Sequence, residues 1–178
     1  MPEDATVNEG ELLARLDRLP VWPYSYNVLI VVGAGFFFSF FDVVAIGFAM
    51  PVFSKQFDVS DEMASWAITS GLIGYIVGSF LDSRISDWYG RRVSLFISVF
   101  AFSFGSIMAA TSTGLWWLVG WRFIAGMGIG AEIALATTYI GEMSPAPLRG
   151  RYSGGAVSAA FLGFDTVPVV ALGLVPNF

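Results

Sequence analysis

The stretch Asp87-Trp88-Tyr89-Gly90-Arg91-Arg92 lies between two long apolar runs, at 64–82 and 93–113. Its charged residues are unsuited to hydrocarbon, because an Asp or Arg at the centre of a membrane helix costs roughly 2.5–3.5 kcal/mol on insertion scales. The glycine permits a sharp change of chain direction. The sequence therefore predicts that two membrane-spanning helices meet here in a tight loop at the membrane surface.

The composition of the whole chain is typical of a membrane protein. Of its 178 residues, 56% are hydrophobic and 13% are charged, whereas soluble domains carry about 25% charged residues. The chain has no histidine and no cysteine, which excludes zinc sites of the His/Cys kind, Cys nucleophiles, Ser-His-Asp triads and disulfides. We expect no metal and no cofactor. The net charge of −5 argues against nucleic-acid binding, which favours clustered Lys and Arg.

Residues 1–27 form a polar, acidic segment that we expect to lie on the cytoplasmic side. Within it, the leucines of the run from Glu11 to Leu19 share one helical face, and the charged residues lie elsewhere. This pattern is typical of an amphipathic helix on the membrane surface. A frayed helix in solution is the alternative.

The remaining residues, 28–178, are predicted to form an all-α integral membrane domain of five helices. Five stretches have about the 20 residues needed to cross the hydrocarbon core. They lie near 28–50, 64–82, 93–113, 115–140 and 153–175.

The arginines are distributed unevenly between the two sides of the predicted bundle. If the N-terminus is cytoplasmic, the outer loops hold only Lys55. Lys and Arg accumulate in short cytoplasmic loops, so we predict a cytoplasmic N-terminus. The arginines on that side are Arg15, Arg18, Arg84, Arg91, Arg92, Arg149 and Arg151.

Small residues recur every three or four positions along several predicted spans. Such spacing allows the backbones of membrane helices to approach closely, and it indicates a packed bundle. The main positions are Gly71, Gly74 and Gly78 in the second span and Gly126 and Gly130 in the fourth.

Three motifs resemble those of the major facilitator superfamily of transporters. The Asp-x-x-Gly-Arg-Arg pattern at 87–92 resembles the loop between helices 2 and 3 of that family. In the fourth span, Arg122-x-x-x-Gly-x-Gly-x-Gly resembles the helix-4 pattern of proton-coupled members. The run Tyr139-x-x-Glu-x-x-Pro-x-x-x-Arg-Gly resembles a signature of sugar porters and related metabolite symporters, with Thr137 in place of the usual proline.

The resemblance covers roughly residues 15–175, with the motifs in the family's order and spacing. It implies a plasma-membrane transporter of twelve helices in two pseudo-symmetric halves, with the substrate near the bilayer midplane. This chain would supply most of the N-terminal half. The implied partners are a small solute such as a sugar or organic acid, protons, the lipid bilayer and a C-terminal half. The alternative is a non-transporting membrane protein or a remnant that binds a partner. A membrane-embedded enzyme is not supported, because no Asp- or Ser-based pairing is visible.

Four ionisable residues within the predicted spans are candidates for a proton and substrate pathway. Asp42 lies among phenylalanines in the first span, where a carboxyl is costly and functional by default. In proton-linked relatives an acid in helix 1 often carries the proton; a structural acid paired with an arginine is the other interpretation. Glu132 lies about 15 Å along the fourth span from Arg122, so these two need other partners. The resemblance implicates Arg122 in proton transfer, but it could also orient a substrate carboxylate or form an ion pair with Asp42 or Asp165. Asp165, near Pro168, is as compatible with a structural as with a functional role.

A second group of charged residues is predicted at the cytoplasmic surface. The resemblance implies a network that latches the two halves of the transporter together. Charges that only set the topology are the alternative, and the two can hold together. The residues are Asp87, Gly90, Arg91, Arg92, Glu142 and Arg149.

Overall fold

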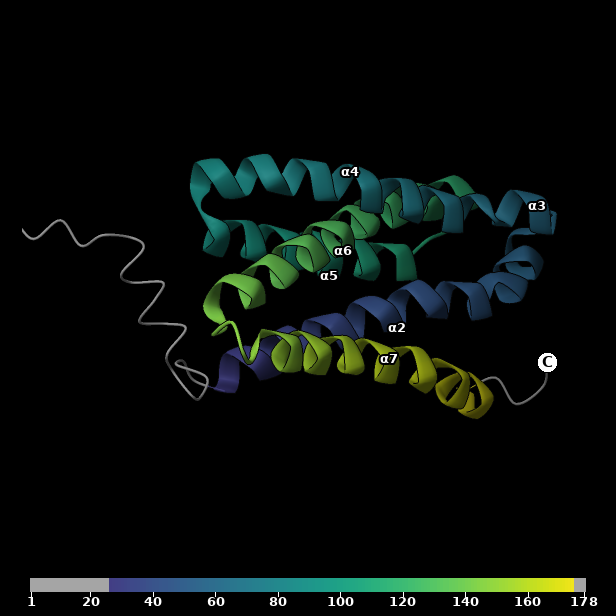
Figure 1. Ribbon diagram of the computed structural model, residues 1–178. Coiled ribbons are helices and arrows are strands. Elements are labelled where there is room, and N and C mark those ends of the chain that lie inside the picture. The colour runs from purple at the N-terminus through teal and green to yellow at the C-terminus, as the bar shows by residue number, and fades with distance from the viewer. Residues whose placement is uncertain (1–25, 175–178) are drawn as a thin grey trace, which may run out of the picture.

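The structure is a computed structural model, and it describes residues 26–174. The amphipathic helix expected at 11–19 lies outside the described residues. The described part of the chain consists of helices joined by short connections (Figure 1). The helices are α2 (Tyr26–Phe57), α3 (Asp61–Ala64), α4 (Trp66–Tyr89), α5 (Arg91–Ala110), α6 (Leu115–Met143) and α7 (Arg149–Leu174).

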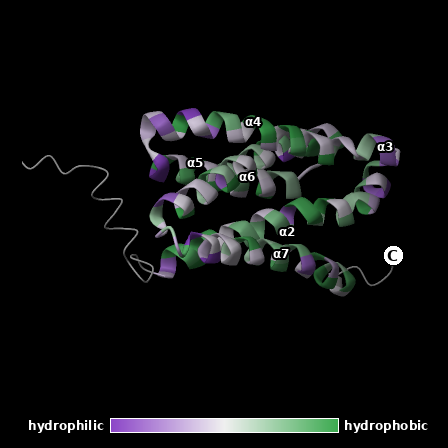
Figure 2. Ribbon diagram, in the orientation of Figure 1, coloured by the Kyte–Doolittle hydropathy of each residue, from purple (hydrophilic) through white to green (hydrophobic). Residues whose placement is uncertain are grey.

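The described residues contain 5 helical segments that are long and apolar enough to cross a membrane. Helix α3 and helix α4 count as one of them. This confirms the predicted all-α membrane fold. Figure 2 shows hydrophobic residues along the middle of the helices and hydrophilic ones mainly towards the ends. The five segments are Tyr26–Gln56, Asp61–Tyr89, Arg91–Ala110, Leu115–Met143 and Arg149–Gly173.

The connection between α4 and α5 is much shorter than the loop predicted at 87–92. Helix α4 continues to Tyr89 and α5 begins at Arg91, so Gly90 alone makes the turn. Gly90 has a φ of 84°, which side-chain-bearing residues rarely adopt. Hydropathy indicates where a chain leaves the hydrocarbon core of the membrane. Backbone hydrogen bonds, however, can continue a helix beyond that point into the membrane–water interface. The expected loop was therefore wrong in length, although the turn falls at the expected glycine.

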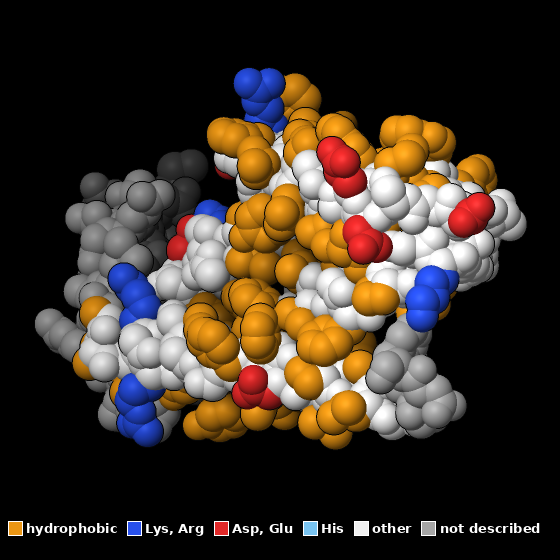
Figure 3. Space-filling view, turned by 90° about the vertical axis from the view of Figure 1, so that its right-hand side faces the viewer, with side chains coloured by type: hydrophobic (Ala, Val, Ile, Leu, Met, Phe, Trp, Pro, Cys, Tyr) orange, Lys and Arg blue, Asp and Glu red, His pale blue; other side chains and the backbone are white. Residues whose placement is uncertain are grey.

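The helices pack in two groups. Helix α6 lies against both α4 and α5, and α2 runs along α7, with fewer contacts between the groups. A core cluster of Val32 and Phe36 from α2, Ala136 and Ile140 from α6, and alanines of α7 joins them. Figure 3 views the molecule from the end that carries α3. Hydrophobic side chains gather in the middle of this face, and charged side chains are scattered singly over it.

Glycines bring the backbones of α4 and α6 together. A Cβ added to Gly74 or Gly78 would collide with the α6 backbone, and one added to Gly130 would meet the carbonyl oxygen of Tyr75. Gly126 faces the backbone of Gly71 in the same way. The glycine positions singled out in the sequence therefore lie opposite one another, at one helix interface.

Candidate functional site

Arg122 of α6 and Asp42 of α2 form an ion pair within the bundle. Arg122 Nη1 donates to Asp42 Oδ2 at 2.7 Å, and the two side chains are 8% and 19% exposed. Ser106 of α5 donates a longer hydrogen bond to Asp42 Oδ1, at 3.4 Å. Of the partners considered for Arg122, the structure thus selects Asp42. The pair connects the two groups of helices.

The guanidinium of Arg122 retains capacity for a further contact. Its Nε is buried and has no hydrogen-bond partner among the described residues. Arg122 also lines a pocket of about 30 Å³ together with Gly71, Tyr75 and Gly126. This volume suits a water molecule or two, and not a metabolite. The pocket beside Arg122 therefore has room for water but not for a metabolite.

Glu132 makes a separate contact between α6 and α2. Its Oε2 accepts a hydrogen bond from Ser39 Oγ of α2 at 3.0 Å, and both residues are buried. A Cβ at Gly35 would collide with the Glu132 carboxylate, so Gly35 leaves the room that the carboxylate occupies. Asp165, by contrast, is exposed on α7. The structure does not bring it to the pair.

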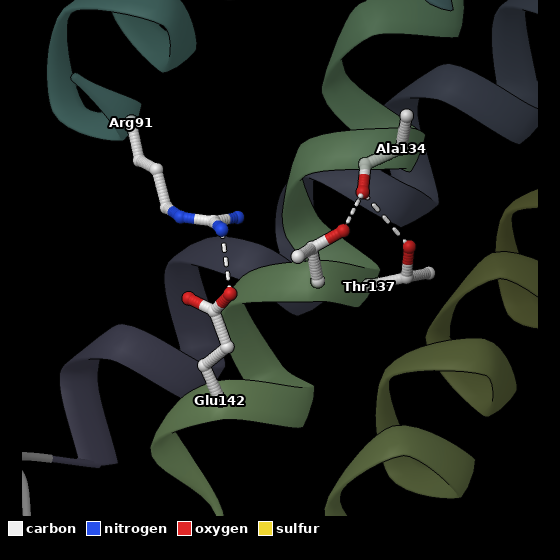
Figure 4. A network of polar contacts seen from close by, with 5 residues as sticks. Arg91, Ala134, Thr137 and Glu142 are labelled. Carbon is white, nitrogen blue, oxygen red and sulfur yellow. Dashed lines mark hydrogen bonds and ion pairs between the residues drawn. The ribbon is translucent and has the colours of Figure 1, made fainter. Parts of the chain in front are cut away.

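The residues of the expected surface network lie at the end of the bundle that carries the Gly90 turn. Arg91 Nη2 and Glu142 Oε1 form an ion pair at 2.5 Å, which joins α5 to α6 (Figure 4). The two side chains are 38% and 53% exposed, and exposed pairs contribute about 0–1 kcal/mol. Asp87, Arg92 and Arg149 are exposed.

Asp82 was missed by the sequence reasoning. It is buried in α4, where its Oδ1 accepts a hydrogen bond from the hydroxyl of Ser94 on α5. Both residues line a pocket of about 70 Å³ with Ser98 and Gly128. The signal was an acid at the last position of the predicted span 64–82. Its position within a continuing helix gives it a partner on the neighbouring helix.

Comparisons with known proteins agree with this architecture. The profile of the Major Facilitator Superfamily matches residues 32–178. The niacin transporter NiaP of Acinetobacter baylyi is 29% identical over 94% of this chain and 38% of its own length. The D-xylose transporter of Levilactobacillus brevis is 34% identical over 64% of this chain and 25% of its own length.

The fold is also found in solved structures. The inward-open xylose transporter XylE of E. coli superposes with a TM-score of 0.71 and 25% identity, over 79% of this chain and 38% of that one. A D-xylose-proton symporter gives a TM-score of 0.72 with 23% identity, over 86% of this chain and 41% of that one. The chain thus spans less than half the length of these relatives. With the profile match over most of its residues, it belongs to the major facilitator superfamily and is a multi-pass membrane protein.

Proposed function

We propose that this chain supplies the first five helices of a proton-coupled secondary transporter for a small organic acid, working by alternating access in the plasma membrane. A cytoplasmic N-terminus is part of the proposal. The family membership supports transport in general. Proton coupling and the substrate class rest on the chemistry of the Arg122–Asp42 pair, which is the observation that carries the proposal.

The buried cation favours an organic acid over a sugar. A carboxylate substrate can replace Asp42 as the counter-ion of Arg122, and bidentate guanidinium–carboxylate pairs are strong and well oriented. A neutral sugar has no charge to offer. Three relatives are named as transporters of acids: niacin, 4-hydroxybenzoate and sialic acid. Two others are named as transporters of the sugars glucose and D-xylose. A sugar remains the second candidate.

The Arg122–Asp42 pair would couple binding of the proton to binding of the substrate anion through charge balance. While Asp42 is ionised, it neutralises Arg122. A proton on Asp42 removes that negative charge and leaves a buried guanidinium without a counter-ion, which is strongly unfavourable. A substrate carboxylate restores the balance. Proton and anion therefore bind favourably only together, and release of both re-forms the original pair.

The other ionisable groups extend this scheme. Glu132 is proposed as a second polar group of the pathway, held by Ser39 in this conformation. The charged end is proposed to contact the second half of the transporter when the other side is open, through the network of Asp87, Gly90, Arg91, Arg92, Glu142 and Arg149. Asp165 is proposed to have no part in coupling, because the contacts of the Arg122–Asp42 pair within the described residues do not include it.

The test is Asp42→Asn in a full-length form, in which this chain is joined to a C-terminal half and reconstituted in vesicles. The amide imitates the protonated carboxyl. Proton-driven accumulation of the acid should be abolished, while exchange of labelled for unlabelled acid continues. Asp165→Asn, which removes the same charge, should accumulate normally. Uphill accumulation by Asp42→Asn would remove Asp42 from the coupling. Uptake of xylose but no acid by the unaltered protein would instead favour the sugar.

The competing interpretation is a membrane protein that does not transport. Absence of any uptake by the full-length form, in which this chain is joined to a C-terminal half, would favour this interpretation over the transporter.

A further inference from the structure

Asp82 of α4 is a buried acid that forms no ion pair. Its side chain is 5% exposed, and the partner that its carboxylate has is the hydroxyl of Ser94, which is neutral. Among the described residues, no Lys or Arg lies within ion-pair distance of Asp82, and Arg91 is paired with Glu142 instead. A buried carboxylate is strongly unfavourable unless a counter-ion lies beside it. An ionised Asp82 therefore requires a cation.

A pocket of about 70 Å³ lies beside this carboxylate, between α4, α5 and α6. Ser98, one turn after Ser94 on α5, also lines it. The Ser98 hydroxyl donates to the carbonyl oxygen of Leu95 at 2.9 Å, which leaves its lone pairs available. The pocket is thus lined by one carboxylate and two hydroxyl groups, and all three residues are buried. Its volume has room for a small ion with one or two water molecules.

We propose that this pocket binds a monovalent metal cation, Na⁺ or K⁺, with Asp82, Ser94 and Ser98 as its ligands and water completing the coordination. Hard cations bind oxygen ligands, and sodium sites in membrane transporters are built from oxygens. The expectation of no metal rested on the lack of His and Cys, and an alkali cation needs neither. The site shares no residue with the Arg122–Asp42 pair or with the charged network, so it stands apart from the transport scheme.

The charge of the site favours a monovalent ion. Asp82 is the only charged residue among the described residues that line the pocket. One positive charge therefore gives neutrality, whereas a divalent ion would leave a buried excess. A proton on Asp82 would balance the charge as well. A proton needs neither the free volume nor the second hydroxyl of Ser98, however, and a coordinated ion uses both.

The site is formed entirely by three helices that are already in close contact. Gly78 of α4 and Gly128 of α6 both line the pocket. A Cβ on Gly128 would collide with the carbonyl oxygen of Ser98, and one on Gly78 would collide with the backbone of α6. Asp82 and the two serines are buried by this packing, so the site needs no further helix to cover it.

The test measures ion binding to the purified 178-residue protein in detergent. Equilibrium dialysis is carried out with radioactive Na⁺ or, in parallel, with radioactive Rb⁺ as a tracer for K⁺, and choline chloride keeps the ionic strength constant. We expect a single saturable site for one of the two ions. The unfolding temperature should rise with the concentration of that ion, because a ligand that binds only the folded state stabilises it.

The charged ligand is tested by Asp82→Asn, which should abolish ion binding. Asp165→Asn is the matched control, because it removes the same charge from an exposed position on α7 and should bind the ion normally.

A second pair of variants tests the hydroxyl ligand. Ser98→Ala leaves the Ser94–Asp82 hydrogen bond in place and should weaken ion binding about ten-fold or more, since even residues that only orient a metal ligand are worth about 10- to 100-fold in affinity. Ser79→Ala should have no effect, because that hydroxyl bonds to its own helix outside the pocket. If Asp82→Asn does not fold, this second pair decides the question.

Lack of saturable binding of either ion to the unaltered protein would overturn the site, and so would binding that survives Asp82→Asn or is equal in the two serine variants. An unfolding temperature that depends on pH but not on Na⁺ or K⁺, with the pH dependence lost in Asp82→Asn, would overturn it in favour of a protonated carboxyl.

Discussion

Ser94 of α5 donates a hydrogen bond to the carboxylate of Asp82 on α4, across the turn at Gly90. Ser94 is 1% exposed and Asp82 is 5% exposed, so the bond lies inside the packed interface of the two helices. The two helices are otherwise joined at this end by a single non-helical residue. The bond therefore fixes how α4 and α5 lie relative to each other where the charged surface begins.

Ser94→Ala should destabilise the protein by about 1–3 kcal/mol, because it leaves a buried carboxylate oxygen without its donor. Thermal unfolding in detergent, followed by helical circular dichroism, measures the change. Ser158→Ala is the control, since that exposed hydroxyl bonds only to a carbonyl of its own helix. If the two variants unfold at the same temperature, the hydrogen bond between Ser94 and Asp82 does not contribute to stability.

Gly130→Ala should weaken the packing of α4 on α6. The added Cβ would meet the carbonyl oxygen of Tyr75, and that backbone atom cannot turn aside as a side chain can. Overpacking of this kind typically costs about 1–3 kcal/mol. The comparison is Gly141→Ala on the same helix, where a Cβ would have nothing within 4 Å. We expect a lower unfolding temperature for Gly130→Ala alone. Equal unfolding temperatures for the two variants would mean that the close packing of α4 on α6 does not contribute to stability.

The spans could be predicted from the sequence because each is a long apolar run, and hydropathy alone identifies such runs. The extent of the helices could not. Helix α4 continues through charged residues to Tyr89, and α2 continues past Pro51 to Phe57, because helical hydrogen bonding does not stop at the edge of hydrocarbon.

The sequence also could not predict which residues pair with the charged side chains inside the membrane-spanning helices. Arg122 could have met Asp42 or Asp165, and the choice depends on how α2 and α7 are rotated about their axes. In the structure Asp165 is exposed and Asp42 faces Arg122. Ser39 as the partner of Glu132 could not be foreseen either, because a serine in a membrane helix can equally bond to its own backbone.

The two ends of the bundle are predicted to lie on opposite sides of the membrane. The chain has no cysteine, so Ser83→Cys and Ser60→Cys each carry one label site, and both positions are exposed. A membrane-impermeant maleimide should label the Ser60 position in intact cells and the Ser83 position only after permeabilisation. The reason is the arginine bias at the end that carries Ser83. Labelling of both from outside would refute the cytoplasmic assignment.

The last prediction is that the 178-residue chain does not transport when it is reconstituted alone. In this fold the pathway lies between two halves, and alternating access moves one against the other. Within the described residues, Arg122 and Asp42 form an ion pair at 2.7 Å, and the pocket beside Arg122 has a volume of about 30 Å³.

That pocket is too small for a metabolite, so a substrate bound at the pair would need the second wall that the other half supplies in this fold. The purified chain is placed in vesicles with an imposed proton gradient and tested with niacin, 4-hydroxybenzoate and xylose, and the xylose transporter of E. coli is reconstituted in parallel as the positive control. We expect no gradient-dependent uptake, together with self-association of the chain through its exposed polar faces. Saturable, gradient-driven uptake of any of the three would contradict this prediction, and it would mean that copies of the chain assemble a pathway between them.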